Sequence, residues 1–161
     1  MRCIHKWINF ILGGVLKMEL VNELNVFLSD LNVFYRKLQN YHWNVYGRDF
    51  FTAHAKLEEY YNEINEQIDE IAEHILILGG QALGRLTDYL ANSKIEEAEN
   101  KKVTSDIIFR ELICDYNTLE GQAIKIKELA DKEDEYSTSS MIDEYIQNYT
   151  KKLWMLNQTM M

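Results

Sequence analysis

Apolar residues recur between positions 20 and 45, mostly at steps of three and four. The row comprises Leu20, Leu24, Phe27, Leu28, Leu31, Phe34, Leu38, Tyr41 and Val45. Because one helical turn takes about 3.6 residues, this spacing puts them on one face of an α-helix of roughly seven turns. The chain has no proline that could interrupt such a helix. A helix this long with one apolar face has to bury that face against other elements.

Three further stretches show helical periodicity. The second helix is predicted over residues 51–78, between Asp49 as a cap and a stop at Gly79 and Gly80. A third is predicted over residues 104–131, and a fourth runs from the Ser/Thr cluster at 137–140 to about residue 156. A shorter helical turn is expected over residues 83–90. We therefore predict an all-α four-helix bundle with a short extra helix between the second and third long helices.

Residues 1–17 stand apart from this pattern. Arg2 and Lys6 precede an apolar stretch from Trp7 to Leu16, which is too short for a transmembrane helix because about 20 apolar residues are needed to span a bilayer. No small-x-small cleavage site follows it, as a secretory signal would require. We expect Met18 to be the natural start, residues 1–17 to be an extension outside the fold, and residues 18–161 to form one domain.

The composition is acidic, with 26 Asp and Glu against 17 Lys and Arg and a formal net charge of -9. Such a surface repels phosphate backbones, so DNA is a disfavoured partner and cations are favoured ones. The two cysteines, Cys3 and Cys114, form neither a disulfide framework nor a CxxC metal motif. We interpret them as free thiols in a reducing compartment, and expect a cytoplasmic protein with no membrane partner.

Five residues form a pattern with metal-binding chemistry. His54 and Glu58 are four residues apart, as are Asp69 and Glu73, so each pair shares a face of the second helix. His42 lies near the end of the first helix, about as far from the turn between the helices as His54 does. An antiparallel hairpin therefore places the two imidazoles at similar height, in a local arrangement suited to a shared metal ion.

The carboxylates of the second helix are too far apart to bind one ion. Glu58 and Asp69 are eleven residues apart, which returns them to nearly the same face but separates them by roughly 16 Å along the axis. A twofold axis midway between them, near Glu63 and Ile64, removes the difficulty, because it sets the imidazole end of one copy against the carboxylate end of the other. The pattern thus predicts a homodimer with two equivalent sites.

The ligand types do not select one metal. Imidazole nitrogen and carboxylate oxygen suit Fe(II), and equally Zn(II), Mn(II) or Co(II). Three carboxylates and two imidazoles per site are enough for two iron ions about 3.5–4 Å apart with a bridging carboxylate. Glu73 is our candidate for that bridge.

The segment YHWNVYGRDFFTAHAKLEEYYNEINEQIDEIAEHILILGG resembles the signature region of the Dps family, the twelve-subunit mini-ferritins. The resemblance extends from about Met18 to the terminal YTKKLWMLNQ. That family spaces its ferroxidase ligands as His-x11-His-x3-Asp/Glu-x10-Asp-x3-Glu. The matching positions here are His42, His54, Glu58, Asp69 and Glu73, with Glu58 standing where many members carry Asp.

The resemblance implies a ferritin-like fold and a function in protection against oxidative stress. It implies Fe(II) oxidation between twofold-related subunits, often with hydrogen peroxide as the preferred oxidant, and storage of Fe(III) mineral in a hollow dodecamer. Trp43, beside His42, matches an indole thought to trap stray radicals. Asp131 aligns with an acid of the threefold iron-entry pore, and Asp134 and Glu135 are nearby.

Other interpretations of these features remain. We interpret His5 and His74 as structural, Trp154 as a packing residue, and Trp43 as a core anchor that could also act in redox chemistry. A DNA-condensing stress protein with secondary iron binding is the alternative function, although residues 1–17 lack the lysine-rich composition of DNA-binding tails. A 24-subunit ferritin is disfavoured because no Glu-x-x-His motif occurs in the sequence.

Overall fold

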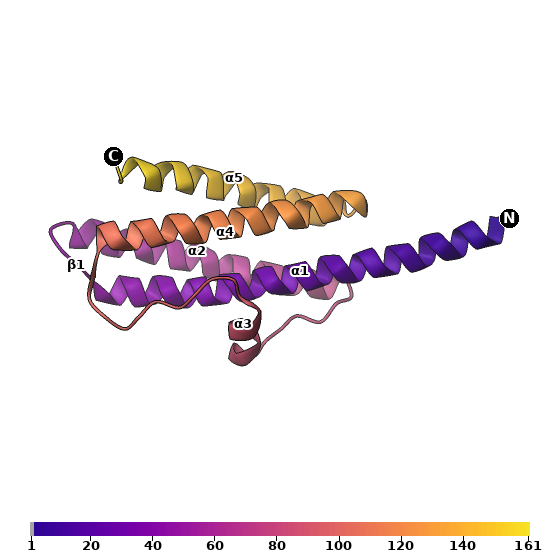
Figure 1. Cartoon of the computed structure of the whole chain (residues 1–161), viewed down its shortest axis with the longest axis horizontal. Helices are drawn as coiled ribbons and strands as arrows, with labels where there is room; N and C mark the ends of the chain where they lie inside the picture. The colour runs from indigo at the N-terminus through magenta and orange to yellow at the C-terminus, as the bar shows by residue number, and fades with distance from the viewer. Residues whose placement is uncertain (1) are drawn as a thin grey trace.

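The computed structural model describes the backbone from Arg2 to Met161 and the side chains from Lys17 onward. The long helices are α1 (Arg2–Asn44), α2 (Phe50–Ile77), α4 (Ser105–Lys132) and α5 (Tyr136–Gln158). They lie side by side as a bundle, with the short helix α3 (Leu86–Asn92) outside it next to α1 (Figure 1). The predicted four-helix bundle with a short helix between its second and third long helices is confirmed.

Helix α1 begins earlier than the apolar pattern predicted. Met18 was the expected start of this helix, whereas the helix begins at Arg2. Its N-terminal part extends beyond the ends of the other long helices (Figure 1). The side chains of Cys3, His5 and the apolar stretch 7–16 lie outside the described residues, so the role given to residues 1–17 stays a prediction.

A short strand pair that the sequence did not predict joins the end of α1 to the start of α4. Strand β1 (Val45–Tyr46) follows α1, and strand β2 (Val103–Thr104) precedes α4. The two are parallel, with Val45 opposite Val103, and both valines are buried. Strands of two residues carry no periodic signal in a sequence. The pair fixes the turn after α1 to the first residue of α4.

The core consists of the apolar rows that the sequence indicated. The residues of the α1 row that are fully buried are Leu20, Leu24, Phe27, Leu28, Leu31, Phe34 and Leu38. On α2, Tyr60 is buried, whereas Tyr61 is only partly buried against the core. Trp154, which we expected to pack, is 61% exposed on α5, because the core side of that helix carries Tyr149, Leu153 and Leu156 instead. The packing interpretation of Trp154 was therefore wrong for the single chain.

A buried ion pair joins α1 to α4. The Lys37 Nζ lies 2.9 Å from Asp115 Oδ2, and the two side chains are only 5% and 8% exposed. Glu111 Oε2, which is more exposed, lies 3.7 Å from the same ammonium. Burial raises the pKa of Asp115 to about 6, although the Lys37 charge and its hydrogen bond favour the carboxylate. The pair is therefore held in an environment that penalises any unpartnered charge.

Replacing Lys37 by methionine is expected to destabilise the protein by about 3–5 kcal/mol, because the Asp115 carboxyl would stay buried without its partner. The double variant Lys37→Met with Asp115→Leu should regain much of that loss. The thermal unfolding midpoint measures both effects. Lys151→Met, at an exposed position, is the matched control and should change the midpoint little. If Lys37→Met lowered the unfolding midpoint no more than the control Lys151→Met does, a structural role for the pair would be contradicted.

The ionisation of Asp115 also predicts a pH dependence. Its pKa is about 6 in the folded chain against an ordinary 3.8, so between these values the folded chain binds more protons than the unfolded chain. The stability contributed by this group therefore falls as the pH rises through that window, by about 3 kcal/mol in all. Asp115→Asn removes the titration. The stability of the unmodified protein relative to Asp115→Asn should decline from about pH 4 to pH 6, and a constant difference would contradict the assignment.

Candidate metal centre

His42 and His54 lie together where α1 ends and α2 begins. Their rings are stacked, with centroids 3.6 Å apart and planes inclined by 21°. Each ring bonds to the backbone of the other residue: His42 Nδ1 lies 2.9 Å from the His54 carbonyl oxygen, and His54 Nδ1 lies 2.8 Å from the His42 carbonyl oxygen. The hairpin therefore places the two imidazoles at the same height, as the sequence predicted.

These two hydrogen bonds fix the proton on each ring. A carbonyl oxygen can only accept, so each Nδ1 donates and carries the hydrogen. In the neutral imidazole the other nitrogen, Nε2, then has a free lone pair. A backbone carbonyl holding Nδ1–H is the usual arrangement behind a metal-ligating histidine, because it fixes both the tautomer and the ring orientation. His42 and His54 therefore present two oriented nitrogen donors.

Aromatic rings hold this pair on both sides. The Phe50 ring stacks on His54 with centroids 5.0 Å apart and an angle of 26°. The Tyr61 ring meets His42 edge-on, at 5.3 Å and 86°, and Tyr35 packs edge-on against Tyr61 at 6.1 Å. The contact of Tyr61 with His42 was not predicted from the sequence. The position of Tyr61 seven residues after His54, and thus on the same helix face, is the signal that could have indicated it.

The Glu58 side chain is exposed one turn after His54 on α2. Its carboxylate lies close enough to the Tyr61 hydroxyl to raise the pKa of that phenol, together with desolvation as the larger cause. Glu58 thus lies on the imidazole side of α2, as its spacing from His54 predicted.

Asp69 and Glu73 lie farther along α2, where both are exposed. With Asn65, Glu66, Ile68 and Glu70 they line an open hollow of about 450 Å³. Four of these six side chains are carboxylates, so the hollow has a negative potential that attracts cations. The hollow is lined by α2 alone, and therefore has no ligands from a second element of the same chain.

The five candidate ligands thus form two separate groups in one chain. His42 lies at the end of α1, and His54 and Glu58 lie at the beginning of α2, whereas Asp69 and Glu73 lie at least eleven residues later on α2. Among the residues that the structure describes, no three His, Cys, Asp or Glu side chains are close enough together to hold a metal ion. One chain therefore offers two incomplete sets of ligands, and the ligand assignment stays a prediction.

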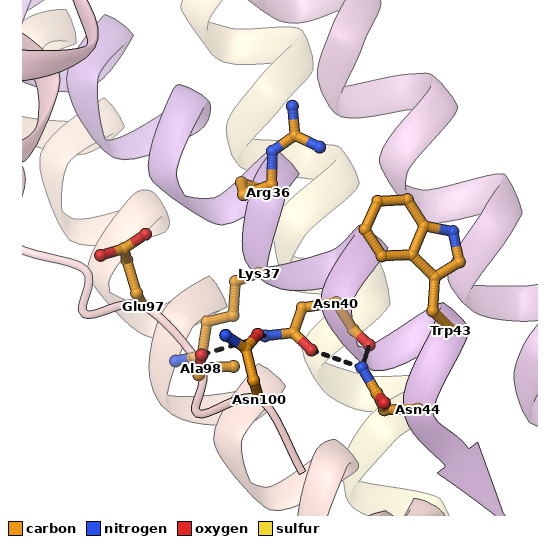
Figure 2. Close-up of a pocket in the computed structure, with 8 residues that line it drawn as sticks. All are labelled: Arg36, Lys37, Asn40, Trp43, Asn44, Glu97, Ala98 and Asn100. Carbon is orange, nitrogen blue, oxygen red and sulfur yellow. Dashed lines mark hydrogen bonds between the residues drawn. The ribbon is translucent and has the colours of Figure 1, made fainter. Parts of the chain in front are cut away.

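Trp43 is not a core residue of the single chain. Its side chain is 62% exposed, because Trp43 lies on the opposite side of α1 from the buried Tyr41. It borders a pocket of about 340 Å³ that also includes Arg36, Glu97 and Asn100. Figure 2 shows the indole at the edge of this pocket, next to the hydrogen bond between Asn40 and Asn44. The core-anchor interpretation of Trp43 was wrong for this chain, and its redox role stays a prediction.

His74, the third described histidine, has the structural role that we expected. It is buried, and its Nε2 lies 2.7 Å from Thr138 Oγ1, which connects α2 to the first turn of α5. Desolvation lowers the pKa of His74, so the neutral ring is favoured.

The acids proposed for a pore lie at the turn between α4 and α5. Asp131 Oδ1 accepts a hydrogen bond of 2.6 Å from Ser139 Oγ, and Asp134 Oδ1 accepts one of 3.0 Å from the Tyr136 hydroxyl. Asp134 has a positive φ of 56°, as a tight turn requires. A threefold pore needs neighbouring copies, so the pore assignment of Asp131, Asp134 and Glu135 stays a prediction.

Comparison with known proteins identifies the family. The ferritin-like domain model matches residues 21–160. The chain is 36% identical over 138 residues to antigen TpF1 of Treponema pallidum, which covers 86% of this chain and 78% of the antigen. It is 35% identical over 133 residues to the DNA protection during starvation protein of Listeria monocytogenes, covering 82% of this chain and 85% of that protein.

A solved structure gives the same result. The crystal structure of a Dps protein from Vibrio cholerae superposes with a TM-score of 0.88 at 33% identity, covering 91% of this chain and 92% of that one. The chain therefore belongs to the ferritin-like family and, within it, to the Dps proteins. In the part of the chain that the structure describes, no helix has the length and apolar character needed to cross a membrane.

Proposed function

We propose that this chain is a ferroxidase and iron-storage protein. It oxidises Fe(II), preferably with hydrogen peroxide, at dinuclear sites between twofold-related subunits and stores the ferric product as mineral in a hollow cytoplasmic shell of twelve subunits. The solved relative from Vibrio cholerae is described as a member of the ferritin-like diiron-carboxylate proteins, which supports iron as the metal. Removing peroxide and Fe(II) together would protect the cell against oxidative stress.

The observation that carries this proposal is the division of the candidate ligands into two incomplete groups. Two oriented imidazole nitrogens lie at one end of α2, and a carboxylate hollow lies farther along the same helix. A second copy of α2 running in the opposite direction brings the carboxylates of each chain to the imidazoles of the other. Both groups are used twice in such a dimer, and neither is left without a partner.

Each residue then has a distinct role toward the substrate iron. His42, His54 and Glu58 would bind iron from one subunit, and Asp69 and Glu73 from the other, with Glu73 bridging two ions. Nitrogen donors suit Fe(II), and carboxylate oxygens suit the more highly charged product. Two Fe(II) ions each lose one electron to one hydrogen peroxide molecule, which takes up two protons and leaves as two waters. Trp43, next to His42 in the sequence, would donate an electron to stray radicals.

An exposed apolar surface supports dimerisation on this side of the molecule. Leu86 and Leu90 of α3 are 77% and 55% exposed, and they line a groove of about 320 Å³ together with Tyr35 of α1. Tyr35 contacts Tyr61, which contacts His42, so two aromatic contacts connect the groove to the imidazole group. A partner that completes the metal site would also cover these leucines, and burying them stabilises the dimer.

DNA protection does not require DNA binding by this chain. Several relatives carry the name DNA protection during starvation protein. The net charge of -9 opposes contact with a phosphate backbone. Consumption of Fe(II) and peroxide would protect DNA without such a contact. We therefore propose protection through iron chemistry, and keep DNA condensation as the alternative.

Mixing two inactive variants tests the shared site. His54→Ala removes a ligand from the imidazole group, and Asp69→Ala removes one from the carboxylate group. Each variant alone should lose rapid Fe(II) oxidation, followed by stopped-flow absorbance with peroxide and, separately, with oxygen. Subunits of both variants, unfolded and refolded together, should regain about one quarter of the unmodified rate, because half of the dimers are mixed and each mixed dimer has one intact site.

Two results would contradict the proposal. If each site lay within one subunit, the refolded mixture would be as inactive as its components. If the single variants kept the full rate, the ligands would be elsewhere. Glu59→Ala, which changes an exposed carboxylate on the same helix next to Glu58, is the matched control and should keep the full rate.

The dimer surface gives a separate prediction. Leu86→Glu with Leu90→Glu places two carboxylates in the apolar groove, and is expected to separate the subunits because charged groups resist burial without partners. Light scattering should show a smaller particle, with Fe(II) oxidation lost in parallel. Thr87→Glu, at an exposed position on the same short helix, is the control. A particle of unchanged mass would exclude this surface from the interface.

A further inference from the structure

Residues 1–17 have a chemical composition unlike the rest of the chain. They include three of the 17 basic residues, Arg2, Lys6 and Lys17, and none of the 26 acidic ones. The ferritin-like domain begins to match only at residue 21, so this segment is not part of the machinery described above. It is nevertheless joined to the bundle without a break, because α1 runs continuously from Arg2 to Asn44.

One helical row changes character where the segment meets the bundle. Steps of three and four lead through Arg2, Lys6, Asn9, Gly13 and Lys17, and then through Leu20, Leu24, Phe27 and Leu31. The second half of this row is fully buried in the core, whereas the first half is basic or uncharged polar with one glycine. The segment therefore does not extend the apolar face that the bundle uses, although it belongs to the same helix.

The apolar positions of the segment fall on the opposite side of the helix. Ile4, Ile8, Ile11 and Val15 also recur at steps of three and four, about half a turn away from the basic row. Trp7 and Phe10 add large aromatic residues to the remaining positions. A short helix with a narrow basic row and a broad apolar sector rich in Trp, Phe, Ile and Leu has the pattern of a helix that lies in a membrane interface.

The charges favour a lipid surface over a second copy of this chain as the partner. A helix of 16 residues is about 24 Å long, shorter than the roughly 30 Å hydrocarbon core of a bilayer, so the segment can lie on a membrane but not cross it. Two copies paired through their apolar sides would turn both basic rows outward, where no acidic residue of the segments balances them. An anionic bilayer supplies both the opposite charge and the apolar phase.

We propose that the N-terminal segment of α1 binds the surface of membranes containing anionic phospholipid, and so holds the acidic bundle at that surface. This revises the expectation of no membrane partner, which rested on the segment being too short to span a bilayer. It also replaces the expectation that Met18 is the natural start. The projection of α1 beyond the other long helices (Figure 1) leaves the bundle outside the contact. That separation matters because the bundle carries all 26 acidic residues and is repelled by anionic lipid.

Vesicle flotation with the full-length protein tests this proposal. The protein is expected to float with vesicles of phosphatidylcholine mixed with phosphatidylserine, and much less with phosphatidylcholine alone. Arg2→Gln with Lys6→Gln should weaken binding roughly 25-fold, since each basic residue near an anionic surface contributes about a factor of five. Ile8→Glu with Ile11→Glu should abolish it. Lys132→Gln with Lys151→Gln, which removes two exposed charges from the bundle, is the matched control and should bind as the unmodified protein does.

Four results would overturn the proposal. The first is binding that is unchanged when residues 1–17 are deleted, and the second is equal binding to both kinds of vesicle. The third is association between particles without vesicles that depends on residues 1–17, which would make a second copy the partner. The fourth is an intact mass showing that the native protein begins at Met18. Fe(II) oxidation by the deleted protein is measured alongside, because it separates failure of this proposal from failure of the ferroxidase.

Discussion

The paired hydrogen bonds between His42, His54 and each other's carbonyl oxygens lock the α1–α2 hairpin and the imidazoles at the same time. Each bond joins the side chain of one helix to the backbone of the other, so neither ring can turn without breaking a hydrogen bond between the helices. The stack of Phe50 on His54 and the edge contact of Tyr61 with His42 hold the pair from two further sides. Because the rings of His42 and His54 are already held in place, little conformational entropy is lost when they bind a metal.

The rest of α2 determines why this group needs a partner. A straight helix separates Glu58 from Asp69 by roughly 16 Å, and the other long helices leave the carboxylate hollow open. Extra packing within the chain would not bring the two groups together, since His54 and Glu58 lie on the same rigid helix as Asp69 and Glu73, and His42 is hydrogen-bonded to that helix. Dimerisation by a twofold axis is the simplest way to unite them, because it needs only one interface for two sites.

The sequence predicted the elements whose signal is periodic. The apolar row from Leu20 to Val45 indicated α1, and the spacing of His42 and His54 around the turn indicated their proximity. The periodic pattern did not predict three features of the structure. The strands of Val45 and Val103 are too short to show a period, the exposure of Trp43 depends on the tertiary arrangement, and the carbonyl partners of the imidazoles are backbone atoms that no residue type reveals. The helical start at Arg2 was missed because the apolar row moves to the other side of the helix there.

The ends of the chain lie at opposite ends of the molecule (Figure 1). Helix α5 finishes at Gln158 on the side of the bundle where β1 connects α1 to α2, whereas α1 starts far beyond the other end. A fluorophore or affinity tag fused after Met161 would therefore sit at the imidazole end of the subunit and is poorly suited to work on iron chemistry. A label carried by the first residues of α1 is distant from that chemistry. It would, however, block the segment that we propose to contact the membrane surface.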